Sequence, residues 1–183
     1  MLEWIQTIDW EILHWIRSTM QGSGMDFLMP KITALGNGGA VWIAAAAAMT
    51  ISKKYRKYGI LLFAALGAGV LIGNVCLKHL VARPRPCWLE TIPLLISNPT
   101  DYSFPSGHTL SSVISAWVLT GVNGKFGLIA IPLAALIAFS RLYLYVHFPS
   151  DVLASVGIGS LIGISALYAA ERMKNPLPGI IKK

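Results

Sequence analysis

Charged residues are scarce in this sequence. They make up 13% of 183 residues, and eight of them are acidic, whereas 55% of the residues are hydrophobic and the mean hydropathy is +0.61. So little polar surface excludes a soluble domain of this size and indicates one small domain embedded in a membrane. The net charge of +7 does not indicate a nucleic-acid partner, because the basic residues form short clusters beside apolar runs without a nucleic-acid motif.

Cysteine is also scarce. Cys76 lies in an apolar run, and Cys87 follows a proline-rich turn. Two cysteines in such different settings favour neither a disulfide nor a metal site, and we interpret both as structural thiols.

The N-terminus lacks an uninterrupted apolar stretch, so we expect no cleavable signal peptide. Apolar side chains recur there at three- and four-residue steps, which predicts an amphipathic helix over residues 4–20. Its tryptophans suit the lipid headgroup zone, so this helix should lie in the membrane interface. We divide the chain, as a single domain, into an interfacial helix (1–24), a membrane helical core (25–171) and a cytoplasmic tail (172–183).

The first part of the membrane core is apolar but interrupted. Residues 25–51 contain Lys31 and a glycine-rich stretch at 36–39. Either one broken helix spans the membrane, or a short half-helix leads into a spanning helix, and we favour the second interpretation. A basic loop at 53–57 then precedes residues 59–77, which are apolar and long enough to cross.

The second part of the core begins with a proline-rich region. Its prolines predict that residues 78–108 are mostly loop, with a small interfacial piece at 89–96. Helices are expected at 109–122 and 126–146, and a last helix should begin at Pro149 and run to residue 170. Three glycines should let that helix pack closely on its neighbours (Gly157, Gly159 and Gly163). The expected fold is all-α, a polytopic membrane helical bundle of about five to six membrane helices.

The charge pattern predicts an orientation. The basic loop at 53–57 and the basic tail should both be cytoplasmic. Counting crossings from that loop puts three polar islands on the other side of the membrane, at residues 78–86, 105–108 and 140–151. Ionisable groups beside membrane segments are expensive and indicate a functional site. Arginines on the non-cytoplasmic side run against the positive-inside tendency, which indicates an anionic ligand.

The first island contains Lys78, Arg83 and Arg85. Arginine offers a planar fork of donors to phosphate oxygens, and lysine offers a mobile point charge. The alternative is that these cations anchor a helix end by reaching toward the interface.

The second island, Ser106-Gly107-His108, stands where a helix is expected to begin. Ser106 suits an N-cap, Gly107 lets an anion approach the backbone, and the free amides of the first turn favour negative charge. His108 would face the same ligand and could exchange protons with it. The alternative is a capping turn with a surface histidine.

The third island contains Arg141, His147 and Asp151. A carboxylate four residues after a histidine, across the start of a helix, can orient one ring nitrogen and leave the lone pair of the other facing outward. Arg141 would point toward the same pocket from the preceding helix. The alternative is a structural hydrogen bond between the histidine and the aspartate.

Three patterns occur in order: Lys78-x6-Arg85-Pro86, Pro105-Ser106-Gly107-His108 and Ser140-Arg141-x5-His147-x3-Asp151. Together they resemble the signature of the type-2 phosphatidic acid phosphatase superfamily, which includes bacterial lipid phosphate phosphatases and undecaprenyl diphosphate phosphatases and shares its site with vanadium-dependent haloperoxidases. The signature spans residues 78–151, and the apolar segments around it agree with a helical membrane member.

The resemblance implies a role for each matching residue. His147 is expected to be the nucleophile that forms a phosphohistidine, Asp151 its orienting partner, and His108 the general acid and base. Further residues would hold the phosphoryl oxygens (Lys78, Arg85, Ser106, Gly107 and Arg141). Arg83, beside the signature, is a candidate for a second phosphate.

The site is expected to work without a metal or another cofactor. Side-chain cations can replace a metal in phosphoryl transfer, which depends mainly on positioning and charge stabilisation. The sequence has no acidic cluster near the islands, and we interpret Glu90 and Asp101 as loop residues without partners.

The predicted function is hydrolysis of a membrane lipid phosphate at the outer leaflet of the plasma membrane. The lipid phosphate and the bilayer are the expected partners. Undecaprenyl diphosphate is the favoured substrate, because Arg83 could meet a second phosphate, while phosphatidylglycerol phosphate and phosphatidic acid stay open. A non-enzymatic lipid or anion carrier and a haloperoxidase are the remoter alternatives, since a carrier has no use for two histidines and haloperoxidases are usually soluble.

Overall fold

The computed structural model describes residues 3–172, which form helices joined by loops, without a β-strand in that range. The elements are α1 (Glu3–Met20), α2 (Ser23–Leu35), η1 (Asn37–Gly39), α3 (Ala40–Ile51), α4 (Arg56–Gly69), η2 (Val70–Leu77), α5 (Lys78–Val81), α6 (Pro86–Leu89), α7 (Gly107–Val122), α8 (Gly124–Tyr143) and α9 (Pro149–Arg172). The all-α prediction is confirmed. The predicted cytoplasmic tail, apart from its first residue, lies outside the described residues.

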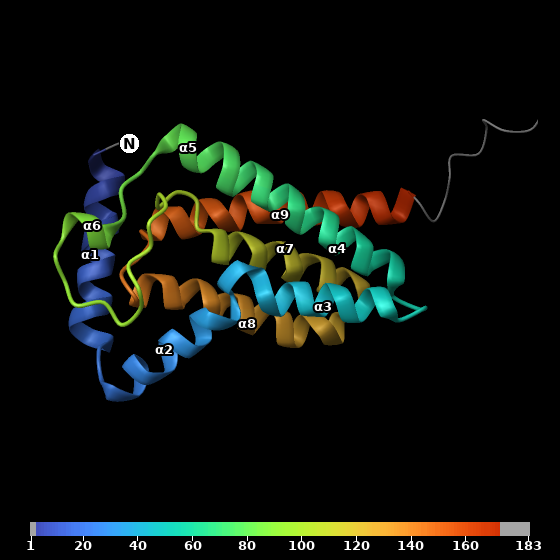
Figure 1. The fold of residues 1–183 in the computed structure, drawn as a ribbon, viewed down its shortest axis with the longest axis horizontal. Coiled ribbons are helices and arrows are strands. Elements are labelled where there is room, and N and C mark those ends of the chain that lie inside the picture. Colours follow the sequence, from blue (N-terminus) through green and yellow to red (C-terminus); the bar gives the residue numbers. More distant parts are fainter. Residues whose placement is uncertain (1–2, 173–183) are drawn as a thin grey trace, which may run out of the picture.

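The long helices form a bundle. Figure 1 shows α3, α4, α7, α8 and α9 running lengthwise, with α1 crossing one end. Helix α7 is the central element, because it packs on α3, α4, α8 and α9 and half of its residues are buried. Leu110 and Ile114 of α7 belong to the main apolar core, and the Trp42 indole of α3 donates a buried hydrogen bond to the Ser112 hydroxyl of α7 (2.9 Å).

Helix α1 matches the predicted amphipathic helix. It buries one side chain per turn along a single face, namely Asp9, Leu13 and Ile16. Leu13 packs with Tyr145 and Phe148 from the α8–α9 connection. The face of α1 that meets the bundle is therefore mostly apolar, and its polar side chains include Asp9 and Gln6, whose Oε1 accepts a hydrogen bond from the Arg83 Nη2 (2.8 Å).

Several helices have the length and composition of membrane spans. Among the described residues these are the segment 56–89, α8 and α9, with 34, 20 and 24 residues. The bent pair of α2 and α3 qualifies as a further span. Helix α7 has 16 residues and runs beside them in the core of the bundle.

The interruption at 36–39 is a helix break. Gly38 and Gly39 have φ values of 57° and 75°, a backbone region that only glycine enters at little cost. Helices α2 and α3 meet there at a bend of 44°. Helix α3 has 12 residues, about 18 Å of helix against an apolar membrane thickness of about 30 Å. Helix α3 is therefore short for a span by itself. The bent pair together has the length and composition of one broken span, which favours the other interpretation.

Two predicted boundaries are corrected by local backbone chemistry. The proline-rich region contains the short helix α6, because Pro86 suits the first turn of a helix and Glu90 is already extended. The predicted interfacial piece at 89–96 is therefore loop after its first residue. Helix α8 ends at Tyr143 rather than at residue 146, because Tyr145 adopts a φ of 60°. That turn sends the chain back toward the bundle just before His147.

The glycines of α9 were predicted to allow close packing. A Cβ at Gly159 would lie 3.0 Å from the Val113 Cβ, and one at Gly163 would lie 2.6 Å from the Trp117 Cβ, so both glycines meet α7 closely. Gly157 has no neighbour within 4 Å of such a Cβ, and the prediction is wrong there.

Candidate active site

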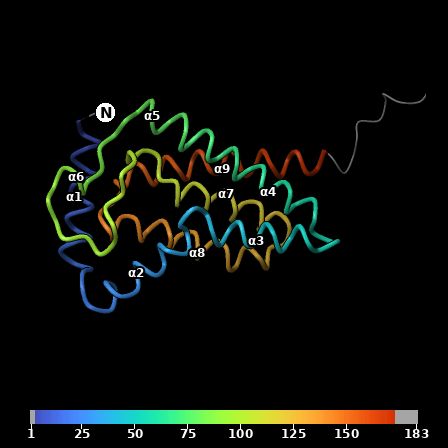
Figure 2. Tube along the Cα trace, viewed as in Figure 1, coloured from blue at the N-terminus to red at the C-terminus, as the bar shows by residue number. Residues whose placement is uncertain are grey.

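The three polar islands meet at the end of the bundle that α1 crosses. Figure 2 shows the long loop that precedes α7 running across this end, beside α1. Arg85 of the first island contacts His147 of the third (3.1 Å). The charges of Arg141, Arg85 and Lys78 also act on His108 of the second island. The structure thus brings the predicted site residues together from segments far apart in the sequence.

His147 is buried in the short connection between α8 and α9. Its Nε2 lies 3.1 Å from the Arg85 Nη1, and because arginine only donates hydrogen bonds, Nε2 accepts and carries the lone pair. The ring proton therefore belongs to Nδ1. Burial lowers the pKa of His147 to about 3, although Asp151 opposes the shift, so the imidazole is neutral at physiological pH. A neutral ring with its Nε2 lone pair beside cations is a competent nucleophile.

Asp151, in the first turn of α9, faces His147 without bonding it directly. The distance from its Oδ2 to the His147 Nδ1 is 3.8 Å, longer than a hydrogen bond. That oxygen instead accepts hydrogen bonds from the Ser103 hydroxyl (2.5 Å) and the Phe148 amide (2.9 Å). The Ser103 hydroxyl also lies 3.5 Å from the His147 Nδ1, so it stands between the carboxylate and the ring.

Lys78 and Arg85 share a carboxylate partner. Asp101 in the loop before α7 bonds the Lys78 ammonium, and its Oδ1 accepts from the Arg85 Nη2 (2.7 Å). Burial raises the pKa of Asp101, but the hydrogen bonds and charges of Lys78 and Arg85 outweigh it and hold the pKa at about 2. The prediction that Asp101 lacks a partner is wrong. In this structure the Asp101 carboxylate forms ion pairs with two cations that were expected to hold phosphate.

Glu90 is the second loop residue that was expected to stand alone. Its carboxylate lies 3.0 Å from the His14 Nε2 and accepts a hydrogen bond from the Tyr145 hydroxyl (2.6 Å). These contacts join the loop to α1 and to the turn after α8, so Glu90 is part of the framework around the site.

Arg141, in the last turn of α8, retains unused donor capacity. Its Nη1 donates to the Thr33 hydroxyl of α2 (2.6 Å), and its buried Nε has no hydrogen-bond partner among the described residues. A buried, unpaired donor on a cation is costly. An anion bound in the site would satisfy it.

The second island begins α7, as predicted. The Ser106 hydroxyl caps the helix by accepting from the Thr109 amide (3.4 Å). A Cβ on Gly107 would lie 3.0 Å from the Asn74 Oδ1, so a larger residue would crowd that side chain. The His108 Nε2 lies 2.9 Å from the Asn37 Oδ1, an acceptor, which indicates that Nε2 carries the proton.

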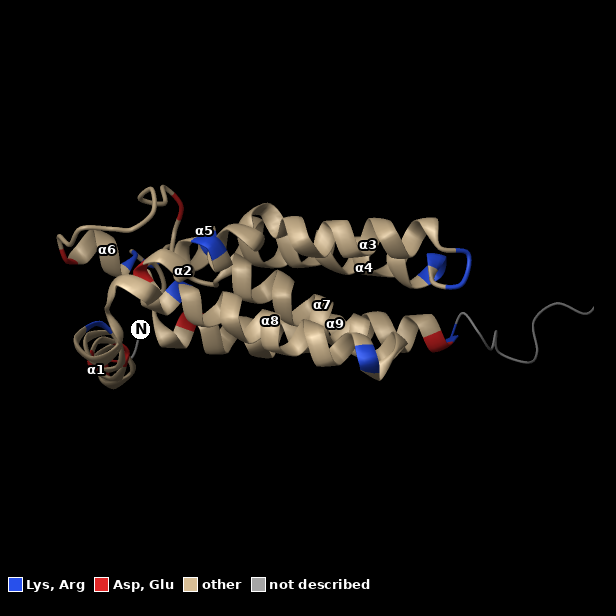
Figure 3. Ribbon diagram, turned by 90° about the horizontal axis from the view of Figure 1, so that it is seen from below, with Lys and Arg blue, Asp and Glu red and all other residues tan. Residues whose placement is uncertain are grey.

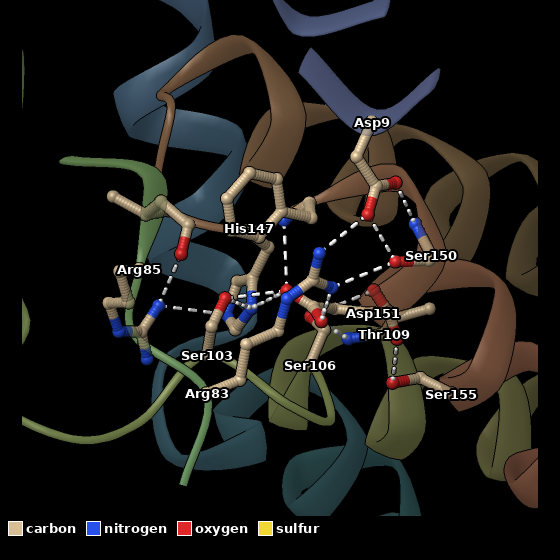
Figure 4. A network of polar contacts seen from close by, with 12 residues as sticks. Asp9, Arg83, Arg85, Ser103, Ser106, Thr109, His147, Ser150, Asp151 and Ser155 are labelled. Atoms are coloured by element: carbon tan, nitrogen blue, oxygen red, sulfur yellow. Dashed lines mark hydrogen bonds and ion pairs between the residues drawn. The ribbon is translucent and has the colours of Figure 1, made fainter. Parts of the chain in front are cut away.

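Arg83, the candidate for a second phosphate, is paired with carboxylates of the protein. Its side chain is 5% exposed and donates to both Asp9 (2.6 Å) and Asp151 (2.5 Å). Figure 4 shows the guanidinium held between these carboxylates. Its terminal nitrogens are therefore used inside the protein, while its Nε has no partner among the described residues. This pairing argues against Arg83 as the site of a second phosphate, which stays an untested prediction.

Sequence reasoning missed several residues that surround the site. Asp9 could have been noticed, because it stands on the apolar face of an amphipathic helix, in line with Leu13. Asn37 could have been suspected from the glycines around it. Ser103 and Thr33 carried no signal, since their positions beside His147 and Arg141 depend on how loops and helices meet.

A metal site is not evident in the part of the chain that the structure describes. Within residues 3–172, no group of three or more His, Cys, Asp or Glu side chains could hold a metal ion. The expectation of metal-free chemistry stays a prediction.

The fold and the buried cluster of histidines and cations define a multi-pass helical membrane protein with a polar site at one end of its bundle. Residues 57–174 match the PAP2 superfamily, and the chain belongs to that family. The resemblance inferred from the three patterns is thereby confirmed.

Two relatives and one solved structure give the range of similarity. An "Undecaprenyl-diphosphatase" from Sulfolobus acidocaldarius is 38% identical over 124 residues, which cover 67% of this chain and 60% of that protein. "Phosphatidylglycerophosphatase B" from Bacillus subtilis is 30% identical over 177 residues, covering 87% and 78%. The crystal structure of a transmembrane PAP2 type phosphatidylglycerolphosphate phosphatase from Bacillus subtilis superposes with a TM-score of 0.78 at 26% identity, covering 94% and 89%. The chain thus matches about 60% of the length of the Sulfolobus relative.

Proposed function

We propose that this chain is an integral membrane lipid phosphatase that transfers a phosphoryl group from a lipid to His147 and then to water. The observation that carries the proposal is the contact between the Arg85 Nη1 and the His147 Nε2 at 3.1 Å. It indicates that a buried, neutral imidazole presents its lone pair toward the cations of the site.

Burial and the charges of Arg141, Arg85 and Lys78 lower the pKa of His108 to about 3. A bound phosphate dianion would offset these cations and favour the imidazolium form of His108.

In the first step the His147 Nε2 attacks phosphorus and the bond from phosphorus to the leaving oxygen breaks. The imidazolium of His108 gives one ring proton to that oxygen and becomes neutral, and a phosphohistidine forms. Positive charge grows on the ring of His147, and the nearby carboxylate of Asp151 stabilises it. The Nδ1 proton, oriented toward Ser103 and Asp151, keeps the ring in the required tautomer.

In the second step His108 removes a proton from water, and the resulting hydroxide attacks the phosphohistidine. The bond from phosphorus to Nε2 breaks, inorganic phosphate leaves, and His147 is restored. Catalysis of this kind rests on in-line positioning and on charge stabilisation.

The phosphoryl oxygens would be held by Lys78, Arg85 and Arg141 together with the first turn of α7 (Ser106 and the Gly107 amide). Arg141 is ready for this role, because its Nε lacks a partner among the described residues. Lys78 and Arg85 would exchange Asp101 for the phosphate, an anion of greater charge. These cations supply the charge stabilisation that a metal would otherwise provide, and we infer that the reaction needs no divalent ion.

Undecaprenyl diphosphate is the substrate we propose, with undecaprenyl phosphate and inorganic phosphate as products. The support is the 38% identity to a protein named undecaprenyl-diphosphatase, since Arg83 no longer argues for a second phosphate. Phosphatidylglycerol phosphate is the second candidate, because the relative and the solved structure with that activity in their names cover 87% and 94% of this chain.

We infer that the active site faces the non-cytoplasmic side of the plasma membrane. Figure 3 shows a basic loop between α3 and α4 at the end of the bundle opposite to α1 and the site. Lysine and arginine favour the cytoplasmic side of membrane proteins, so the site end would face outward.

The test compares rates of phosphate release by the purified protein on undecaprenyl diphosphate, phosphatidylglycerol phosphate and phosphatidic acid, in detergent with a metal chelator present. We expect the first lipid to react fastest. His147→Ala should lower the rate at least about a thousandfold, because it removes the nucleophile, and the folded state should be checked by thermal unfolding.

Three outcomes would contradict parts of the proposal. A requirement for a divalent ion would refute the metal-free mechanism, and faster turnover of phosphatidylglycerol phosphate would move the assignment to that lipid. Wild-type protein that binds lipid phosphates without releasing phosphate would indicate a carrier.

A further inference from the structure

A buried polar network connects the N-terminal helix to the nucleophile. Figure 4 shows it running from Asp9 through Arg83 to Asp151, beside His147. The Arg83 Nη2 donates to the Asp9 Oδ2 (2.6 Å), and its Nη1 donates to the Asp151 Oδ1 (2.5 Å). Three segments, α1, the loop after α5 and the first turn of α9, are thereby joined through one guanidinium.

Asp9 also bonds the start of α9 directly. Its Oδ1 accepts from the Ser150 amide (2.8 Å), and its Oδ2 accepts from the Ser150 hydroxyl. The carboxylate of a distant helix thus satisfies a free amide in the first turn of α9, the turn that carries Asp151. Movement of Asp9 would shift both contacts that hold this turn.

The network is too buried to be an incidental surface contact. Asp9 is 2% exposed, Arg83 is 5% exposed and Asp151 is fully buried. Burying charges is expensive, and apolar side chains of similar size often serve stability as well or better. Gln6, a neutral side chain on the same face, also accepts from the Arg83 Nη2 (2.8 Å). A buried charge at Asp9 therefore calls for a reason beyond docking α1 to the bundle.

Charge balance provides that reason. Arg83 lies between two carboxylates, and its guanidinium also stacks over the Phe148 ring at 4.0 Å. With Asp151 alone, the positive charge of Arg83 would neutralise the carboxylate that must stabilise His147 as it becomes positive. The second carboxylate, Asp9, balances the positive charge of Arg83, so the negative charge of Asp151 can stabilise the His147 ring.

We propose that Asp9 is a positioning residue for phosphoryl transfer, acting on His147 through Arg83 and Asp151. This inference rests on the proposed function, because it assumes that His147 is the nucleophile. Asp9 lies in the amphipathic N-terminal helix, outside the three sequence patterns, so this helix would also be required for the chemistry. Substrate phosphate does not touch Asp9, so its loss should lower kcat and leave KM nearly unchanged.

The experiment measures kcat, KM and the unfolding temperature of full-length variants on the lipid that the wild-type protein hydrolyses. Asp9→Asn should lower kcat about 10- to 100-fold, the scale expected when a catalytic group is misplaced, with KM changed less than about twofold. Asp9→Glu keeps the charge and should recover part of kcat. Ser150→Ala removes a neutral hydroxyl that donates to Asp9 and accepts from the Arg83 Nη1 (2.8 Å), and it should give a smaller fall in kcat while the protein stays folded.

Two controls separate positioning from docking of α1. Glu11→Gln removes the same charge from an exposed position two residues along the helix, and its kcat should equal that of the wild type. Ile16→Ala weakens the apolar contact of α1 with the bundle, so it should lower the unfolding temperature and leave kcat within about twofold, because apolar docking does not set the charge near His147.

The inference is overturned if the kcat of Asp9→Asn equals that of Glu11→Gln, or if Asp9→Asn raises KM and leaves kcat unchanged. It is also overturned if Ile16→Ala, at an unfolding temperature equal to that of Asp9→Asn, loses as much kcat as Asp9→Asn does. If Asp9→Asn does not fold, Asp9→Glu and Ser150→Ala are compared with the wild type. A wild-type kcat in both variants overturns the inference. Failure of the proposed function is a separate result, since the wild-type protein would then release no phosphate or His147→Ala would remain active.

Discussion

At the scale of single residues, the hydrogen-bond partners of three arginines at one end of the molecule determine which of them can bind a ligand. Arg83 is bonded between two carboxylates, Arg85 bonds one carboxylate and two backbone carbonyls, and Arg141 bonds a threonine hydroxyl. An arginine whose donors are satisfied by buried carboxylates has little left for a ligand. Arg83 and Arg141 each have a buried Nε without a partner among the described residues. The charge of Arg83 is balanced by two carboxylates, whereas Arg141 bonds a neutral hydroxyl, so Arg141 is the better placed of the two to bind an anion.

Asp101→Asn should strengthen inhibition of the phosphatase by inorganic phosphate. The carboxylate now pairs with Lys78 and Arg85, so a phosphate must displace it. Asp101 is largely exposed, and water screens such pairs, so we expect the inhibition constant to fall about three- to tenfold, equivalent to about 1 kcal/mol. The measurement is a series of inhibition curves at one pH and ionic strength.

The matched control for this prediction is Glu90→Gln. It removes the same charge from the same loop, but its carboxylate bonds His14 and Tyr145 and not the phosphate cations. Its inhibition constant should stay near that of the wild type. Weaker inhibition in Asp101→Asn would show that Asp101 orients the cations and does not compete with phosphate.

At the scale of elements, the spacing between α7 and α9 depends on small residues. A Cβ at Gly163 would lie 2.6 Å from the Trp117 Cβ and 3.3 Å from the Ile114 carbonyl oxygen. Neither is the end of a flexible side chain, so the helices would have to separate. Helix α7 carries His108 and α9 carries Asp151, so this contact also sets how the two sides of the site approach each other.

Gly163→Ala should therefore destabilise the protein by about 1–3 kcal/mol, the usual effect of overpacking. Gly157→Ala on the same helix meets nothing within 4 Å and should be neutral or stabilising by up to about 1 kcal/mol, since alanine favours helices. Thermal unfolding in detergent measures both, with about 2–4 °C per kcal/mol at this size. Equal unfolding temperatures would refute the close α7–α9 contact.

At the scale of the whole molecule, charge separates the two ends of the bundle. Figure 3 shows the basic loop between α3 and α4 at one end, and acidic and basic residues mixed around α1 and α6 at the other. Mixed charges that pair with one another can be buried at an interface, whereas unpaired lysines and arginines stay on the cytoplasmic side. The polarity of the whole bundle is thus the basis of the proposed orientation.

Labelling should reveal this orientation in intact spheroplasts. In a Cys76→Ser, Cys87→Ser background, Ser97→Cys in the exposed loop before α7 should react with a membrane-impermeant maleimide. Lys54→Cys in the basic loop should react only after lysis. The reverse pattern would place the site on the cytoplasmic side and contradict the proposal.

Much of the helical framework was predictable because local patterns determine it. Helix α9 was expected from Pro149 onward, α7 from the capping serine, and α1 from its apolar periodicity, and these agree with the structure. The failures occurred where local rules compete. Tyr145 has a φ of 60° although its residue type does not favour it, so the end of α8 did not follow from the sequence. The glycines at 36–39 were compatible with both interpretations of residues 25–51, so composition did not decide between them.

The sequence by itself determined the membrane composition, the family patterns and the identity of the groups that phosphoryl transfer needs, because residue types and spacings state these directly. The tertiary structure decided which of those groups have free donors. It paired the terminal nitrogens of Arg83 with Asp9 and Asp151 and paired Lys78 with Asp101. Within residues 3–172 it left the Nε atoms of Arg83 and Arg141 without a hydrogen-bond partner. The physical reason is that a buried charge must be paired, and its partner is supplied by whichever distant segment the fold brings within hydrogen-bond distance.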